Sequence, residues 1–248
     1  SSGGIYDGFI GSIDSDGNLI WLKQLSSTGD NSIYDANIFE DNTSIISGYF
    51  SNTTSFSGSN ISSTGGTDVI VSKLDSSGSV VWTRNFGGTS NDVSYGSTIL
   101  DNGNSIISGY FNGTASFGDT TLTSAGDADG FVTKLDSDGN VLWAKKFGST
   151  GIDTVYDISL LDDDCFISGF FAGSVVFGDT TLTSNGGYES YFAKLNSDGD
   201  VVWAKKFGGT GGDGGYDIKV LPDGSSIISG NFRNNTDFGG TTLTSAGD

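Results

Sequence analysis

One feature limits the fold of this chain more than any other: a block of about 61 residues occurs four times. The copies are marked by the four tryptophans, Trp21, Trp82, Trp143 and Trp203, which lie 61, 61 and 60 residues apart. Four tyrosines keep the same spacing: Tyr34, Tyr95, Tyr156 and Tyr216. Such self-similarity indicates a repeat architecture, in which each copy buries its apolar surface against its neighbours. We therefore predict that residues 1–248 form a single domain of four copies.

The residue pattern within a copy predicts two β-hairpins. In the third copy the first hairpin is expected over 131–147, about a turn at 137–140, and the second over 156–171, about an acidic turn. The Asp, Asn and Gly residues of these turns tolerate the positive φ angles of tight hairpins. Because no stretch carries apolar residues at helical spacing, we expect about sixteen main strands and almost no helix.

A four-stranded sheet cannot bury both of its faces alone, so the copies must stack. The chain begins with a hairpin of the first kind, at 9–25, and ends with one of the second kind, at 216–232. If each sheet joins a second hairpin to the first hairpin that follows it, the two ends complete one blade together. We predict an all-β, four-bladed β-propeller of four ~61-residue, four-stranded repeats, closed by pairing the N- and C-terminal half-blades. Exchange of the terminal half-blade between neighbouring chains is the alternative.

The Ile-Ile-Ser-Gly element at 45–48, 106–109 and 227–230 is the most constant apolar strand, and the third copy has Phe-Ile-Ser-Gly at 166–169. We expect this strand near the axis, because Gly lets crowded backbones approach. The alternative is that the Gly marks a β-bulge.

Two longer stretches resemble a known repeat family. They are Asp-Val-Ile-Val-Ser-Lys-Leu-Asp at 68–75, followed by Val-Val-Trp at 80–82 and Asn-Phe-Gly-Gly at 85–88, and Leu-Asp-Asn-Gly-Asn-Ser-Ile-Ile-Ser-Gly at 100–109. The chain resembles the bacterial β-propeller repeats of the SBBP type in all four copies. That resemblance implies export and a place outside the cell or on the surface of a bacterium. The family is usually described with more than four blades.

Composition excludes several functions. With 11 basic and 30 acidic residues, the chain has a formal charge of −19, which does not suit the positive footprint that nucleic acid requires. No apolar run approaches the roughly 18 residues of a membrane span, so we expect no membrane insertion. The chain contains no His, which removes imidazole catalysis and His metal sites. Cys165 takes the place of a Ser in the other copies, and we interpret it as a small strand residue.

Acidic side chains recur at one position in every copy: Asp7, Asp68, Asp129 and Glu189. Glycoside hydrolysis needs two carboxylates in different environments, whereas repeated carboxylates have similar ones. We therefore predict that the chain is not an enzyme. If one end of a ring gathered these four residues, their oxygens could bind Ca²⁺ as a cofactor. The alternative is that each carboxylate accepts hydrogen bonds from turn backbone in its own blade.

Five Asn-x-Ser/Thr sequons are candidate glycosylation sites: Asn42, Asn52, Asn60, Asn112 and Asn234. The regular repeats without a distinctive site favour a non-catalytic, exported structural or adhesive scaffold. Its partner would be itself, in a cell-surface array or extracellular filament. The alternative is a multivalent, lectin-like propeller that binds surface polysaccharide through one aromatic and acidic pocket per blade.

Overall fold

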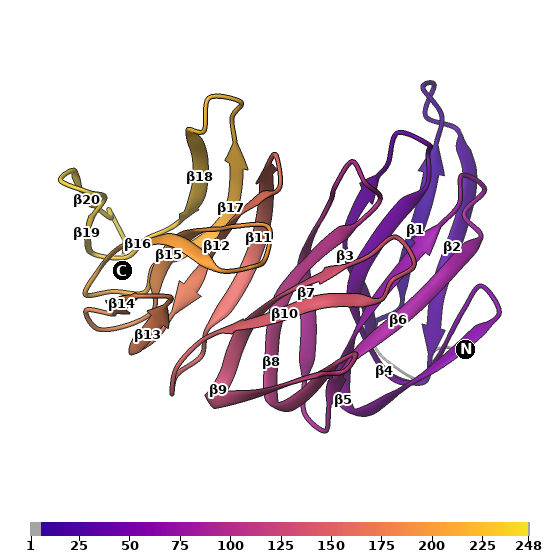
Figure 1. Cartoon of the computed structure of the whole chain (residues 1–248), viewed down its shortest axis with the longest axis horizontal. Coiled ribbons are helices and arrows are strands. Elements are labelled where there is room, and N and C mark those ends of the chain that lie inside the picture. The colour runs from indigo at the N-terminus through magenta and orange to yellow at the C-terminus, as the bar shows by residue number, and fades with distance from the viewer. Residues whose placement is uncertain (1–5, 248) are drawn as a thin grey trace.

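The computed structural model describes residues 6–247 and is built from antiparallel β-sheet alone (Figure 1). Twenty strands lie in this range, and no residue in it is helical. The all-β prediction is confirmed. No segment between residues 6 and 247 forms a helix long and apolar enough to cross a membrane.

Three complete four-stranded units follow one another along the chain. Unit A comprises β3 (Asn31–Ile38), β4 (Ser44–Phe56), β5 (Ser59–Leu74) and β6 (Val80–Gly88). Unit B comprises β7 (Asp92–Ile99), β8 (Ser105–Phe117), β9 (Thr120–Leu135) and β10 (Val141–Phe147). Unit C comprises β11 (Thr154–Leu161), β12 (Asp164–Phe171), β15 (Glu189–Leu195) and β16 (Val201–Gly209). Each unit joins a second hairpin to the first hairpin that follows it, as predicted.

A half-unit lies at each end of this series. The N-terminal half-unit is the hairpin of β1 (Gly8–Ile13) and β2 (Leu19–Ser27), which matches the second half of a unit. The C-terminal half-unit is the hairpin of β17 (Gly214–Val220) and β18 (Ser226–Asn231), which matches the first half. Short outer hairpins complete the chain, namely β13 (Ser174–Phe177) with β14 (Thr180–Thr183) and β19 (Asn235–Asp237) with β20 (Thr242–Thr244).

The core lies between successive units, because each sheet buries its faces against its neighbours. Leu25 of the N-terminal half-unit packs with Ile46 and Phe50 of unit A, and Val71 of unit A packs with Ile107 of unit B. Further clusters join unit B to unit C and unit C to the C-terminal half-unit. Cys165 is fully buried in the first of these two clusters, which confirms its assignment as a strand residue. The stacking of copies face to face is therefore observed.

The tryptophans link each unit to the next one. Trp82 Nε1 donates a hydrogen bond of 3.0 Å to the Ser137 carbonyl of the following unit, and its ring covers Gly139. Trp21 and Trp143 make the same contacts one unit earlier and one unit later. These rings pack against a turn of the neighbouring unit, so they belong to the inter-unit contact.

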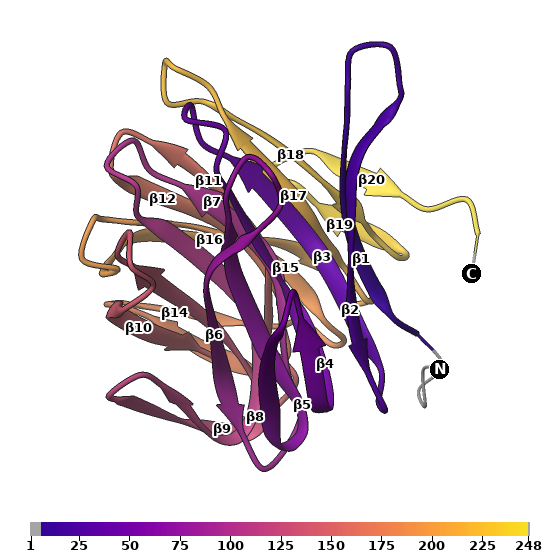
Figure 2. The same cartoon turned by 90° about the vertical axis from the view of Figure 1, so that its right-hand side faces the viewer.

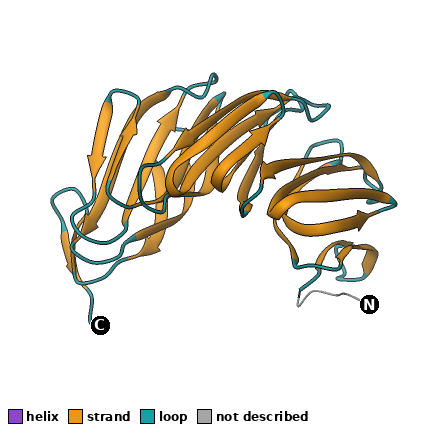
Figure 3. Cartoon of the chain, turned by 90° about the horizontal axis from the view of Figure 1, so that it is seen from below, coloured by secondary structure: helices purple, strands orange, loops and turns teal. Residues whose placement is uncertain are grey.

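The units form an open arc (Figure 3), with the N-terminal half-unit at one end and the C-terminal strands at the other. Figure 1 places β1–β2 and β19–β20 on opposite sides of the molecule, and Figure 2 looks along this direction, so that the two hairpins overlap in its view. Within residues 6–247, β17–β18 forms a separate two-stranded sheet, and β1 pairs only with β2. The structure therefore does not show the closure of the half-blades, which stays a prediction.

Candidate functional site

A β-bulge occurs at the same place in the first strand of every unit. Opposite Gly48, the register of β3 shifts between Ile33 and Asp35, which leaves Tyr34 as the extra residue. A Cβ on Gly48 would lie 2.0 Å from the Ser32 carbonyl oxygen, so only Gly fits here. The bulge interpretation of the Ile-Ile-Ser-Gly element is confirmed.

The bulge also explains the position of that element within its sheet. The first strands of the units, β3, β7, β11 and β17, are the ones that lie beside one another from unit to unit. The Ile-Ile-Ser-Gly strand lies one strand further out, in the middle of its sheet. The Gly thus accommodates the bulge of the neighbouring strand. A place of this element near the axis of a closed ring stays a prediction.

The bulged tyrosines stack into a continuous ladder along the molecule. The ring centroids of Tyr34 and Tyr95 lie 5.4 Å apart, those of Tyr95 and Tyr156 4.9 Å, and those of Tyr156 and Tyr216 5.1 Å. Aromatic pairs at such separations contribute about 0.5–1.5 kcal/mol each beyond their burial. The ladder therefore couples all units through one row of side chains, which sequence reasoning missed although the tyrosine spacing marked it.

The exposed side of the ladder forms a shallow groove with acidic residues. The rings of the ladder line it together with Asp35, Asp157, Asp217 and Lys219. Asp35 Oδ2 accepts hydrogen bonds of 2.7 Å from the Ser97 main-chain N–H and hydroxyl. Burial raises the pKa of Asp157 to about 6, and Asp157 Oδ2 accepts a 3.0 Å hydrogen bond from the Ile218 main-chain N–H. These two carboxylates therefore join neighbouring units.

The two inner tyrosines of the ladder, Tyr95 and Tyr156, are held in the neutral form by burial. Burial raises the pKa of Tyr95 and of Tyr156 above the usual value of 10. The exposed Tyr34 and Tyr216 leave half of their surface to solvent, at 50% and 46%. Such a groove offers ring edges, hydroxyls and carboxylate oxygens, which suit hydrogen bonding to a neutral polar ligand.

The four acidic residues predicted to bind metal lie in four separate copies. Asp68, Asp129 and Glu189 are fully buried, and Asp7 is half-buried with its Oδ2 accepting a 2.7 Å hydrogen bond from Gln24 Nε2. In residues 6–247, no group of three or more carboxylate or thiol side chains is placed to hold a metal ion. The predicted residues therefore do not meet in one cluster.

Three of these carboxylates, all but that of Asp7, are instead held by main chain nearby. Asp68 Oδ2 accepts a hydrogen bond from the Thr64 N–H at 3.1 Å, and Asp129 Oδ2 accepts one from the Ala125 N–H at 3.1 Å. Glu189 Oε1 likewise accepts a 3.1 Å hydrogen bond from the Asn185 main-chain N–H. This is the turn-capping alternative described above. The copies that contain Asp68 and Asp129 each have a second buried carboxylate. Asp92 in the former is fully buried, and Asp153 in the latter is almost fully buried.

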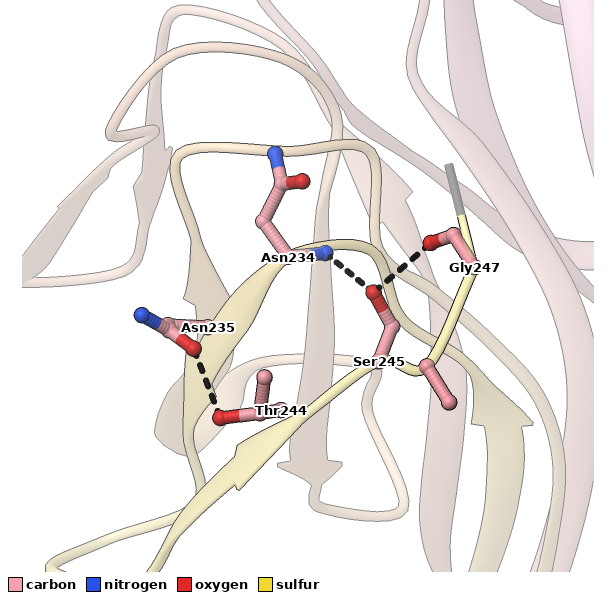
Figure 4. A pocket seen from close by; sticks show the side chains of 6 residues that line it. Asn234, Asn235, Thr244, Ser245 and Gly247 are labelled. Carbon is pink, nitrogen blue, oxygen red and sulfur yellow. Dashed lines mark hydrogen bonds between the residues drawn. The ribbon is translucent and has the colours of Figure 1, made fainter.

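The sequons lie on exposed turns and outer hairpins, with one exception. Asn42, Asn52, Asn60 and Asn234 are exposed, whereas Asn112 is half-buried. Figure 4 shows the pocket beside β19 and β20, where the Asn234 main-chain N–H donates to Ser245 Oγ at 2.9 Å. The Asn234 amide points away from that hairpin, so it is open to attachment of a glycan. Glycosylation itself stays a prediction.

Two sheet edges carry large exposed apolar side chains, and both belong to half-units. On β1, Phe9 is 71% exposed and Ile13 66%, and on β18, Ile227 is 64% exposed. The residues at the same positions inside the units, such as Ile70 and Ile106, are 1% exposed. We call these two edges the β1 edge and the β18 edge. Large exposed apolar edges of this kind mark interaction sites.

Comparisons with known proteins show weak similarity and no family. No family model matches the chain. The chain is 24% identical over 178 residues to "Regulatory protein FlaEY" of Caulobacter vibrioides, covering 68% of this chain and 18% of that protein. It is 26% identical over 153 residues to "Uncharacterized WD repeat-containing protein L264" of Acanthamoeba polyphaga mimivirus, covering 54% of this chain and 11% of that protein.

The matched region is thus less than a fifth of the length of either relative. Among solved structures, a protein of unknown function from Bacteroides caccae is 13% identical, with 79% of this chain and 74% of that chain covered and a TM-score of 0.35. The chain is therefore weakly similar to these proteins, and the comparisons assign no activity to it.

Proposed function

We propose that this chain is a non-catalytic structural scaffold whose copies join end to end, as the subunits of an extracellular array or filament. One observation carries the proposal: in each complete unit the second strand pairs with the third, and the β18 edge and the β1 edge are an unpaired second strand and an unpaired third strand. Unit A pairs β4 with β5, unit B pairs β8 with β9, and unit C pairs β12 with β15. The strand β18 matches the first member of these pairs, and β1 matches the second.

The repeats define the register of the proposed contact. In unit A, Ser44 pairs with Leu74 and Gly48 with Ile70. Unit B has the same arrangement, with Ser105 opposite Leu135 and Gly109 opposite Phe131. By alignment of the copies, Ser226 of one chain pairs with Ile13 of the next, and Gly230 pairs with Phe9. Phe9 and Ile13 then become buried, as their equivalents are in every complete unit.

The tryptophan contact fits the same junction. Trp203 occupies the same repeat position as Trp21, Trp82 and Trp143. The ring of Trp143 packs against the turn that contains Gly199, but within residues 6–247 no corresponding turn packs against Trp203. The equivalent turn of the next chain contains Ser15 and Gly17, and no atom lies within 4 Å of a Cβ on Gly17. Joining two chains places this turn under Trp203.

The tyrosine ladder also continues through the junction. Tyr216 is the last ring of one chain, and Tyr34 is the first ring of the next. Each lies in the strand that packs beside the first strand of a neighbouring unit. The contact is heterologous, because the β18 edge binds the β1 edge and not itself, and repeated heterologous contacts build linear assemblies. Adding a strand in this way supplies main-chain hydrogen bonds as well as apolar burial.

The non-catalytic part of the proposal rests on where reactive groups lie. Cys165 is fully buried, and burial raises the pKa of its thiol. The paired carboxylates Asp68 and Asp92 have no exposed surface that a substrate could reach. Export and a place on the bacterial surface are supported by the resemblance to SBBP-type repeats, which the comparisons do not test.

The test of assembly is light scattering after size exclusion over a wide range of protein concentrations, with negative-stain imaging of the same samples. Assembly predicts a mass that grows with concentration in steps of the 25.6 kDa chain, and unbranched filaments. A constant 25.6 kDa mass at every concentration would overturn the proposal. A compact monomeric ring in the images would support the predicted four-bladed propeller closure instead.

The second candidate function is binding of a neutral surface polysaccharide along the ladder. The groove favours it, because a carboxylate follows the tyrosine in unit A, unit C and the C-terminal half-unit, as Asp35, Asp157 and Asp217, whereas unit B has Gly96 there. Equivalent sites in a row give avidity to a polymeric ligand. Glycan-array binding that is lost in Tyr34→Ala and Tyr216→Ala variants would support this function, and no binding to diverse neutral glycans would reject it.

A further inference from the structure

The tyrosine ladder brings four oxidisable rings into contact along one groove. Successive ring centroids lie 5.4, 4.9 and 5.1 Å apart, and all four rings line the same open groove. Contacts between tyrosines of one unit are longer, because the centroids of Tyr34 and Tyr49 are 5.7 Å apart and those of Tyr95 and Tyr110 5.9 Å. Among residues 6–247, the three shortest tyrosine–tyrosine contacts therefore join one unit to the next.

Packing alone does not require a phenol in this row of rings. In unit C the position of Tyr49 and Tyr110 is occupied by Phe170, whose ring lies 5.7 Å from that of Tyr156. A phenylalanine therefore serves as a packing partner of the ladder. The bulge position, by contrast, carries a tyrosine in all four copies of the repeat.

Few other side chains of this chain compete with the ladder for an oxidant. Methionine sulfur and exposed thiolates are common sites of protein oxidation. The sequence contains no Met, and Cys165, its single Cys, is fully buried. Tyr34 and Tyr216, at the two ends of the ladder, are exposed. An oxidant that reaches this groove therefore meets tyrosine rings.

We propose that the ladder is a site of oxidative cross-linking, at which tyrosines of successive units are joined into dityrosine. The oxidant is hydrogen peroxide, used by a haem peroxidase that takes one electron and one proton from each of two phenols. The two phenoxyl radicals form one carbon–carbon bond between ring carbons ortho to the hydroxyls, and the ortho hydrogens then move to the phenol oxygens. In sum, two tyrosines lose two hydrogen atoms, and hydrogen peroxide becomes two molecules of water.

The geometry favours coupling between units of one folded chain. Two rings that are already in contact react without diffusing together, which gives each a high effective concentration for the other. Tyr95 and Tyr156 have the shortest contact, with their planes inclined by 39°, so we expect their link to be the main product. Asp35, Asp157 and Asp217 line the same groove, where their carboxylates can accept the released protons.

A dityrosine at this place would fasten unit B to unit C. Residues 95 and 156 are far apart in the sequence, and cross-links that close long loops stabilise a fold most, by restricting the unfolded chain. The cross-link forms within one chain, so the proposal does not depend on end-to-end joining.

The test treats the wild-type chain with a haem peroxidase and hydrogen peroxide at a protein concentration low enough to keep it monomeric. Trypsin then separates the ladder tyrosines, because Lys73, Lys134 and Lys194 lie between successive ones. We expect linked peptides that contain Tyr95 and Tyr156 and are two hydrogen atoms lighter than their sum, as mapped by tandem mass spectrometry. Dityrosine fluorescence and a higher melting temperature of the oxidised chain should accompany them.

Phenylalanine variants distinguish the ladder from exposed tyrosines in general. Tyr156→Phe keeps the ring but removes the phenol, so the links to Tyr95 and to Tyr216 should be lost. Tyr188→Phe is the matched control, because Tyr188 is 42% exposed and its ring contacts Phe170. The control should give the wild-type yield of linked peptides. Tyr95→Phe repeats the test if Tyr156→Phe fails to fold.

The origin of each link is read from a mixture of ordinary and isotope-labelled chains. Links within a chain join peptides of the same labelling, whereas links between chains also join peptides of different labelling. Absence of linked ladder peptides from the oxidised wild type would overturn the proposal, as would links formed only between chains. An equal loss of links in Tyr188→Phe and Tyr156→Phe would also contradict it.

Discussion

The interior units and the terminal half-units carry nearly the same sequence, yet their apolar residues differ in exposure. Ile106 of β8 is 1% exposed, whereas Ile227 at the same position of β18 is 64% exposed. On the other side of the same contact, Phe131 of β9 is fully buried and Phe9 of β1 is 71% exposed. The difference therefore comes from the missing neighbour and not from the residues.

The local structure of the half-units is otherwise that of the interior. β17 has the same bulge, with a register shift between Gly215 and Asp217, and a Cβ on Gly230 would lie 2.0 Å from the Gly214 carbonyl oxygen. Hairpin geometry is thus fixed within a hairpin, while burial is fixed by the adjacent one. The half-units are preformed halves of one interface, and this preorganisation lowers the cost of joining them.

The largest expected effect comes from a charge placed on the β1 edge. Phe9→Lys leaves the monomer folded because residue 9 is exposed there, but it buries an unpaired ammonium group in the joined unit. Such a group costs about 3–5 kcal/mol, so assembly should weaken by roughly 10²–10³-fold. Light scattering against concentration measures this change.

Ile20→Lys is the matched control for that variant. Ile20 is 61% exposed, and its equivalents Val81, Leu142 and Val202 are 57%, 53% and 56% exposed within complete units. A lysine here stays in solvent after joining, so assembly should be unchanged. Equal loss of assembly in both variants would show that net charge, and not the β1 edge, controls association.

A second pair of variants compares the same isoleucine position in a complete unit and in the C-terminal half-unit. Ile106→Ala removes a buried side chain and should lower the free energy of unfolding by about 2–5 kcal/mol. Ile227→Ala should change that free energy in the monomer by about 0.5 kcal/mol or less, and weaken assembly instead. Urea denaturation at low protein concentration measures the first effect. A large loss of monomer stability in Ile227→Ala would mean that β18 is already covered.

The smallest effect concerns pH. Burial raises the pKa of Asp92 and of Asp153 to about 6, above the 3.8 of an ordinary Asp. The folded chain then holds more protons than the unfolded chain between these values, so stability should fall as pH rises from about 4 to 6. Asp92→Asn should flatten this slope by about 1–2 kcal/mol in total.

Urea denaturation at several pH values gives that slope, and Asp101→Asn on an exposed turn is the control. Asn is already tolerated at the position of Asp92, because Asn31 occupies the equivalent position in the first copy and accepts a hydrogen bond from Thr54. Stability that rises with pH over this range in wild type would contradict the assignment of the buried carboxylates.

Much of the fold was predictable from spacing alone. The four tryptophans defined the copies, and the order of the hairpins predicted which pair forms one sheet. The acidic turn within the predicted hairpin over 156–171 is also observed, since Leu161 pairs with Asp164 about a two-residue turn in which Asp162 has a φ of 54°. These features depend on local turn chemistry, which sequence reports directly.

The candidate sites depended on contacts between copies and were harder to predict. The tyrosines were visible as a repeat, but their stacking follows from a bulge that turns each ring toward the next unit. The carboxylates Asp68, Asp129 and Glu189 looked equivalent until the residue across the sheet was known, and that residue is Asn85 in one unit and a lysine in two others. Whether the ends meet depends on a partner surface that local sequence does not define.

The most direct test of end-to-end joining is a disulfide at the predicted register. Ser226→Cys and Ile13→Cys variants are mixed under mild oxidation, while Cys165 stays buried and unreactive. We expect covalent dimers from this mixture, and none when Ser12→Cys replaces Ile13→Cys, because adjacent residues of a strand point to opposite faces. Equal yields from both mixtures, or no dimers from either one, would contradict pairing of the β1 and β18 edges.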